Sequence, residues 1–213
     1  MAVSRLFLHC LCFILLFGCV SSAPIRRHGR APSSRQHGAS SNSFRGACSK
    51  TPDPQMCSRV LAASSAPPSA SLDRQISAVS SFALHLTYSS YHLAQHLATI
   101  PPPRSAPRTY RGALQDCMEL MSDTVDQLKL SISRLSELGN TRGPSYIMRS
   151  QLMDAQVSLS ASYTYQDTCS GELHDKRMPS VPTAQLRKQV GDTSNAVAVA
   201  LALADTLHQR IAP

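Results

Sequence analysis

The chain has 213 residues, no tryptophan and only 5% aromatic residues, so its core must be built from aliphatic side chains and methionine, which favours packed helices over sheets. The formal net charge of +8 lies mostly near the N-terminus, because from Ala47 onward 15 Lys and Arg are balanced by 13 Asp and Glu. Nucleic-acid binding would therefore rest on the N-terminal segment alone, and the sequence has no P-loop or G-x-S-x-G segment to support an enzyme.

Residues 1–23 are predicted to be a secretory signal peptide. Arg5 precedes an apolar run from Leu11 to Phe17, and small residues suited to cleavage follow. The run is shorter than a membrane span, and no later segment is uniformly apolar over such a length. We therefore expect a secreted, extracellular protein without a membrane span.

Residues 24–43 are predicted to form a basic, disordered tail. The segment is rich in Ser, Arg, Gly and Pro and has no acidic residue, so it cannot bury enough apolar surface to fold alone. The simplest interpretation is a solvated linker. Electrostatic binding to a polyanion and processing at Arg26-Arg27 are alternatives.

Residues 44–61 are predicted to form a compact helical hairpin. Pro52 and Pro54 force a bend, and Cys48 and Cys57 would join two short helical arms across it.

Four long helices are then predicted, over residues 72–100, 109–138, 145–169 and 183–211. Each carries apolar side chains at steps of three and four. Pro101–Pro103 end the first helix, and a turn with glycine, asparagine and proline at 139–144 separates the second from the third. Because the connectors are short, we predict an all-α, up-down-up-down four-helix bundle over residues 72–211.

Four cysteines follow the predicted signal peptide: Cys48, Cys57, Cys117 and Cys169. An even number in an oxidising compartment indicates two disulfides, with three possible pairings. Closeness in sequence favours Cys48–Cys57. Residues 117 and 169 are equally far from the turn at 143, so antiparallel helices would bring them side by side, which favours Cys117–Cys169. The other pairings, and a zinc site with unusual spacing, are the alternatives.

Several motifs, taken in order, resemble the plant pectin methylesterase inhibitor/invertase inhibitor family. The most specific is Ala113-Leu114-Gln115-Asp116-Cys117-Met118-Glu119, which is similar to the family segment A-L-x-D-C-x-E. The cysteine hairpin at 44–61, Asp167-Thr168-Cys169 and Ser194-Asn195-Ala196 resemble further family segments. The resemblance covers residues 44–211, which we predict to be one inhibitor-like domain.

The resemblance implies a cell-wall (apoplast) protein that blocks the substrate cleft of pectin methylesterase in a 1:1 complex and does no chemistry itself, with no cofactor and no metal. An inhibitor of acid invertase is the alternative, although the chain lacks the Pro-Lys-Phe tripeptide associated with that branch. A bundle that has lost inhibition and acts as a wall-associated interaction protein is a further alternative. Met121, Thr124 and Ser162 depart from the usual family residues. In this setting the polyanion for the basic tail would be de-esterified pectin.

Six polar side chains of the two middle helices lie off the core stripe and are candidate contacts with the target enzyme: Asp116, Glu119, Asp123, Gln156, Ser160 and Thr164. For any single one of them an ordinary solvated position is the favoured interpretation, and Asp116 is the strongest candidate because it lies in the most specific motif.

Three histidines of the first long helix, His85, His92 and His96, are expected to be surface residues. His92 and His96 have the i, i+4 spacing of a metal pair, but Leu93 stands where a zinc protease needs Glu. A less favoured hypothesis is that these histidines sense the pH of the surroundings.

Overall fold

A computed structural model describes residues 44–174, 178 and 180–211 of the chain. Within these residues every regular element is a helix: α3 (Arg45–Cys48), α4 (Pro54–Ala63), α5 (Leu72–Thr99), α6 (Tyr110–Asn140), α7 (Ser145–Leu173) and α8 (Ser180–Ile211). The predicted signal peptide at 1–23 and basic tail at 24–43 lie outside the described residues. None of the described helices is long and apolar enough to cross a membrane.

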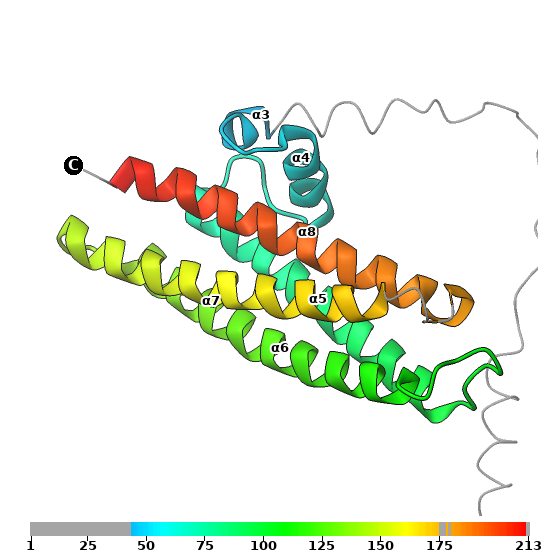
Figure 1. Ribbon diagram of the computed structural model, residues 1–213. Coiled ribbons are helices and arrows are strands. Elements are labelled where there is room, and N and C mark those ends of the chain that lie inside the picture. The colour runs from blue at the N-terminus through cyan, green and yellow to red at the C-terminus, as the bar shows by residue number, and fades with distance from the viewer. Residues whose placement is uncertain (1–43, 175–177, 179, 212–213) are drawn as a thin grey trace, which may run out of the picture. The chain divides into compact units, whose positions relative to one another are not determined.

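The four long helices form the predicted bundle (Figure 1). Helix α6 packs between α5 and α7, and α8 closes the bundle by packing on the same two helices. Consecutive helices run in opposite directions, as their short connections require. The prediction of an all-α, up-down-up-down bundle preceded by a disulfide-stapled hairpin is therefore confirmed.

Two helix boundaries differ from the prediction for identifiable reasons. Helix α7 continues one turn beyond Cys169 because Leu173, four residues on, is fully buried and extends its apolar stripe. Helix α8 begins at Ser180 rather than at Thr183. Pro182 lies in its first turn, where the missing N–H of proline has no intrahelical acceptor in any case.

The hairpin of α3 and α4 is fixed at its bend. Cys48 and Cys57 are bonded, with their Cα atoms 5.7 Å apart. Asp53 caps α4 by accepting hydrogen bonds from the backbone N–H groups of Gln55 and Met56 at 3.0 and 2.9 Å. Pro54 occupies the first helical position, where its fixed φ suits a helix start. The hairpin packs on α5 and α8, and its buried Leu61 joins the core of the bundle.

A second disulfide joins Cys117 of α6 to Cys169 of α7, with the Cα atoms 4.8 Å apart. Two turns further along, Gln166 Nε2 donates a buried hydrogen bond to Thr124 Oγ1 at 3.1 Å. Both links lie far from the turn that connects the two helices, so α6 and α7 are joined by the turn at one end and by these links toward the other.

Hydroxyl side chains fill much of the interior between helices. Among the described residues, eight buried ones donate to the carbonyl four residues earlier in their own helix: Ser58, Ser80, Thr87, Ser90, Thr124, Ser162, Thr193 and Thr206. Because each hydroxyl is satisfied locally, it needs no partner on a neighbouring helix. These residues therefore serve as small packing residues, which lets the helices approach closely.

Replacing both cysteines of the Cys117–Cys169 disulfide with alanine should lower the free energy of unfolding by about 4 kcal/mol in the chain-entropy model, because the bond joins residues 52 apart. The same replacement at Cys48 and Cys57, which are 9 apart, should cost about 3 kcal/mol. Urea unfolding of the two variants and the parent protein measures both losses. A larger loss for the hairpin pair would contradict this ranking.

Candidate functional site

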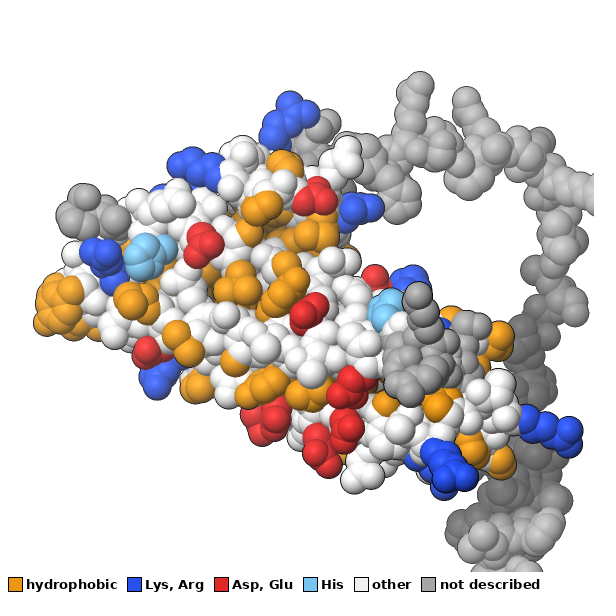
Figure 2. All heavy atoms as spheres, in the orientation of Figure 1, with side chains coloured by type: hydrophobic (Ala, Val, Ile, Leu, Met, Phe, Trp, Pro, Cys, Tyr) orange, Lys and Arg blue, Asp and Glu red, His pale blue; other side chains and the backbone are white. Residues whose placement is uncertain are grey.

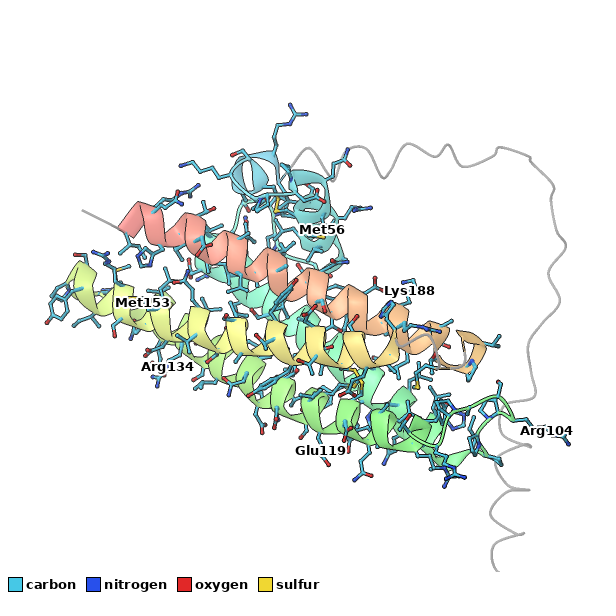
Figure 3. All side chains as sticks on the ribbon, viewed as in Figure 1. Met56, Arg104, Glu119, Arg134, Met153 and Lys188 are labelled. Atoms are coloured by element: carbon cyan, nitrogen blue, oxygen red, sulfur yellow. A yellow bond between two sulfur atoms is a disulfide. The ribbon has the colours of Figure 1, made fainter. Side chains whose placement is uncertain are left out.

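The acidic candidates lie together on the outer face of α6. Asp116, Glu119 and Asp123 are exposed, and Asp126 continues the series, so that steps of three and four place all four carboxylates on one stripe. Figure 2 shows acidic side chains gathered over α6, and Glu119 points away from the bundle in Figure 3. We call Asp116, Glu119, Asp123 and Asp126 the acidic stripe.

The three candidates on α7 have different surroundings. Ser160 and Thr164 are exposed, and the Thr164 hydroxyl donates to the Ser160 carbonyl at 3.1 Å, so it is engaged with its own helix. Gln156 is half-buried and donates to Asp205 Oδ1 of α8 at 2.6 Å. The structure therefore brings Ser160 and Thr164 to the outer surface of α7, whereas Gln156 lies toward the groove between α7 and α8.

Sequence reasoning missed the apolar side chains of this surface. Tyr146, Met153 and Val157 of α7 are 69%, 53% and 70% exposed, and their spacing of seven and four places them on one side of the helix. Leu130 of α6 is 44% exposed. The sequence could have indicated this apolar surface, because these residues interrupt an otherwise polar face opposite the buried Leu152. We call Tyr146, Met153, Val157 and Leu130 the apolar patch.

The pairing of α6 with α7 sets the order of these groups along the outer face. Cys117 is bonded to Cys169, Thr124 lies beside Gln166, and Arg134 approaches Asp154 at 3.9 Å. The acidic stripe is therefore level with the C-terminal half of α7. The apolar patch lies toward the connecting turn, with the hydroxyl residues of α7 between the two groups. Met153 and Arg134, labelled in Figure 3, mark the apolar half.

A hollow of about 530 Å³ adjoins the acidic stripe where α6 begins and α7 ends. It is lined by Pro107, Thr109, Gly112, Ala113, Asp116, Gly171, Glu172 and Met178. Burial raises the pKa of Glu172, and the negative charge of Asp116 raises it further. Its Oε2 atom is buried and has no hydrogen-bond partner. The hollow therefore favours a cationic or hydrogen-bond-donating group.

The histidines give no sign of a metal centre. His85, His92 and His96 are exposed on α5, and the ring of His92 meets Tyr91 edge-on at 5.9 Å. Within the described residues, no three His, Cys, Asp or Glu side chains are grouped so that they could hold a metal ion.

Comparison with known proteins identifies the domain. The family described as plant invertase/pectin methylesterase inhibitor matches residues 42–203. The chain belongs to this family. The resemblance seen in the sequence motifs is thus confirmed, and the matched family is one of inhibitor domains rather than catalytic domains.

Similar curated proteins of Arabidopsis thaliana support this assignment. Pectinesterase inhibitor 3 is 28% identical over 142 residues, which are 67% of this chain and 65% of that protein. Probable pectinesterase/pectinesterase inhibitor 6 is 31% identical over 169 residues, which are 74% of this chain and 27% of that protein. This inhibitor-family chain therefore spans less than two thirds of the length of either relative.

Solved structures of pectin methylesterase inhibitors from Arabidopsis share the fold. A mutant form matches with a TM-score of 0.58 and 15% identity, over 76% of this chain and 95% of the other. A second inhibitor structure matches with a TM-score of 0.51 and 16% identity, over 78% and 96%. At such low identity, the likeness establishes the inhibitor fold alone.

Replacing Glu172 with Gln should make this inhibitor-family domain less sensitive to pH. Because the folded-state pKa of Glu172 is raised, its stabilising contribution is present below the pKa of the unfolded chain and is lost as pH rises through the folded pKa. The variant should therefore melt at a higher temperature than the parent near neutral pH and at nearly the same temperature below about pH 4. Thermal unfolding across this range measures the difference.

The matched control is Asp167→Asn, which removes an exposed carboxylate from the same helix. The prediction requires Glu172→Gln to change the pH dependence of melting more than this control does. Parallel melting curves for the parent and Glu172→Gln at every pH would show that burial of Glu172 has no consequence for stability.

Proposed function

We propose that the protein is a secreted inhibitor of pectin methylesterase, which covers the pectin-binding cleft of the enzyme with the outer face of α6 and α7 in a 1:1 complex. The supporting observation is that the acidic stripe and the apolar patch lie at successive levels of this one face, the patch toward the turn between α6 and α7 and the stripe toward the Cys117–Cys169 disulfide. Acid invertase is the second target to test, because the family includes inhibitors of both enzymes. Pectin methylesterase comes first because the curated relatives are named for pectinesterase and the chain has no Pro-Lys-Phe tripeptide.

The apolar patch suits the centre of a protein interface. Exposed tyrosine, methionine and valine side chains lose contact with water when a partner covers them, and aromatic anchors often carry much of the binding energy. Tyr146, Met153 and Val157 project from a long helix of the bundle, so little backbone conformational entropy is lost on binding.

The acidic stripe suits recognition of a basic surface on the enzyme. Exposed carboxylates contribute mainly to the rate of association and to the choice of partner, because their attraction acts at a distance and is screened by salt. The hollow beside Asp116 and Glu172 offers a place for a cationic side chain of the partner. Ser160 and Thr164 add a small, neutral surface that permits close approach.

The predicted signal peptide supports export to the cell wall, where a pectin methylesterase would be met. Removal of residues 1–23 would leave the basic tail at 24–43 and the inhibitor domain at 44–211. The proposal requires no cofactor, because the protein blocks access of the substrate and does not react with it.

The function is tested by titrating the oxidised protein into assays of pectin methylesterase and acid invertase at the acidic pH of the wall. Stoichiometric loss of pectin methylesterase activity is the expected result. Loss of invertase activity alone would assign the other target. Full activity of both enzymes would indicate a wall-associated interaction protein without inhibitory function.

Replacing Val157 with Asp should weaken binding to pectin methylesterase by about 2 kcal/mol, or roughly thirtyfold, because a carboxylate would be desolvated within the apolar patch. Val181→Asp is the matched control, since Val181 is 87% exposed on α8, away from the outer face of α6 and α7. Isothermal titration calorimetry measures both affinities. Equal affinities of the two variants would exclude the apolar patch from the interface.

Replacing Asp123 with Asn should slow association about threefold at low ionic strength and leave dissociation nearly unchanged, because an exposed charge acts mainly on encounter. Surface plasmon resonance at several salt concentrations measures both rates. Asp192→Asn, which removes a carboxylate of α8 paired with Lys188 at 2.6 Å, is the control. A purely dissociation-based effect of Asp123→Asn would contradict a steering role.

A further inference from the structure

The connection between α5 and α6 is built from two similar turns. The tetrads Pro103-Arg104-Ser105-Ala106 and Pro107-Arg108-Thr109-Tyr110 follow each other directly. In each, the last backbone N–H donates to the proline carbonyl, at 2.9 Å in the first turn and 3.0 Å in the second. Arginine therefore occupies the second position of both turns.

The last residue of each turn anchors it to the core. Ala106 packs against the apolar cluster around the Cys117–Cys169 disulfide, and Tyr110 is a buried member of that cluster with 1% exposure. The prolines further restrict the backbone, so the connection loses little conformational entropy on binding.

Arg104, Arg108 and Arg111 are exposed around this connection, and we call them the arginine loop. Figure 3 shows Arg104 projecting away from the bundle at the tip of the connection, and Figure 2 shows basic side chains at the same end. Because the two turns are anchored inward, the arginines are presented to solvent in a defined arrangement.

Ion pairing within the described residues does not account for these three charges. Within the described residues none of the three has an ion pair or a side-chain hydrogen bond, in contrast to Arg134, which pairs with Glu137 at 3.0 Å. Two of them also lie at the start of α6, whose first turn has no acidic residue. Cations are unfavourable at the positive end of a helix dipole, whereas anions are favourable there.

We propose that the arginine loop binds de-esterified pectin, a linear polymer of uronate residues. The argument rests on the proposed function, because hydrolysis of methyl esters by the target enzyme turns a neutral polymer into one with a carboxylate on each released unit. Three exposed cations, two on consecutive turns and one at the start of the helix that follows, suit an extended polyanion better than a small anion. This surface holds the inhibitor on pectin that the enzyme has already processed.

The test compares two triple variants of the chain that follows the predicted signal peptide. Arg104→Gln/Arg108→Gln/Arg111→Gln removes the arginine loop. Arg142→Gln/Arg149→Gln/Arg210→Gln removes the same charge from the opposite end of the bundle. Both are made with and without Gln at the four tail arginines, so that binding by the tail is measured separately: Arg26, Arg27, Arg30 and Arg35.

Binding to polygalacturonate is measured over a series of salt concentrations, with fully methyl-esterified pectin as the neutral polymer. The loop variant should bind polygalacturonate about tenfold more weakly at low salt and with a flatter salt dependence, because fewer counterions are released. The opposite-end variant should change less than about threefold. Equal losses in both variants, or no loss in the loop variant, would overturn the proposal.

Two further measurements distinguish binding of polyuronate from binding of any polyanion and from inhibition of the enzyme. Double-stranded DNA is tested as a different polyanion, and equal binding with equal loss in the loop variant would overturn the assignment to polyuronate. Inhibition of pectin methylesterase is assayed independently for each variant. Polygalacturonate binding without inhibition would support this inference and refute the proposed function. Inhibition without polygalacturonate binding would support the proposed function and refute this inference.

Discussion

The covalent link between Cys117 and Cys169 is the constraint on which the outer face of the bundle depends. Helices α6 and α7 are joined by a turn at one end and by this disulfide toward the other, with the buried bond from Gln166 to Thr124 between them. A shift of one residue along either helix would rotate its side chains by about 100°. The two attachments prevent such a shift, so the acidic and apolar groups keep their relative positions.

The domain carries its charges in separate regions. The acidic stripe follows the exposed side of α6, while the arginine loop lies at the N-terminal end of the same helix and in the connection before it. Opposite charges this close would partly neutralise each other if their side chains met, yet none of the three arginines is paired within the described residues. The anchored turns keep the cations directed outward. A protein partner and a polymer can therefore contact neighbouring surfaces of one domain.

The sequence predicted the features that depend on periodicity and on strong turn signals. The four long helices followed from apolar spacing, and the positions of Cys117 and Cys169 about the turn favoured the pairing that the structure has. Residues that break a stripe were harder to interpret. Pro182 was treated as a connector residue, although proline is compatible with a first helical turn.

Properties that depend on three-dimensional neighbours were beyond the reach of the sequence. The raised pKa of Glu172 results from burial at the end of α7 and from Asp116 on another helix, which no local pattern reveals. The hydrogen bond between Gln156 and Asp205 joins residues 49 positions apart. The apolar patch could be predicted from the sequence, because Met153 and Val157 lie off the buried stripe of α7.

The locally satisfied hydroxyls of the interior bear on how this fold tolerates sequence change. A buried serine such as Ser80 or Ser162 donates its hydrogen bond to a carbonyl of its own helix. Replacement by alanine removes the hydroxyl that needed an acceptor, and no polar group on another helix loses its partner. Many interior positions can thus drift among alanine, serine and threonine without a compensating change elsewhere. This tolerance accords with the fact that solved inhibitors with only 15% and 16% identity to this chain share its fold.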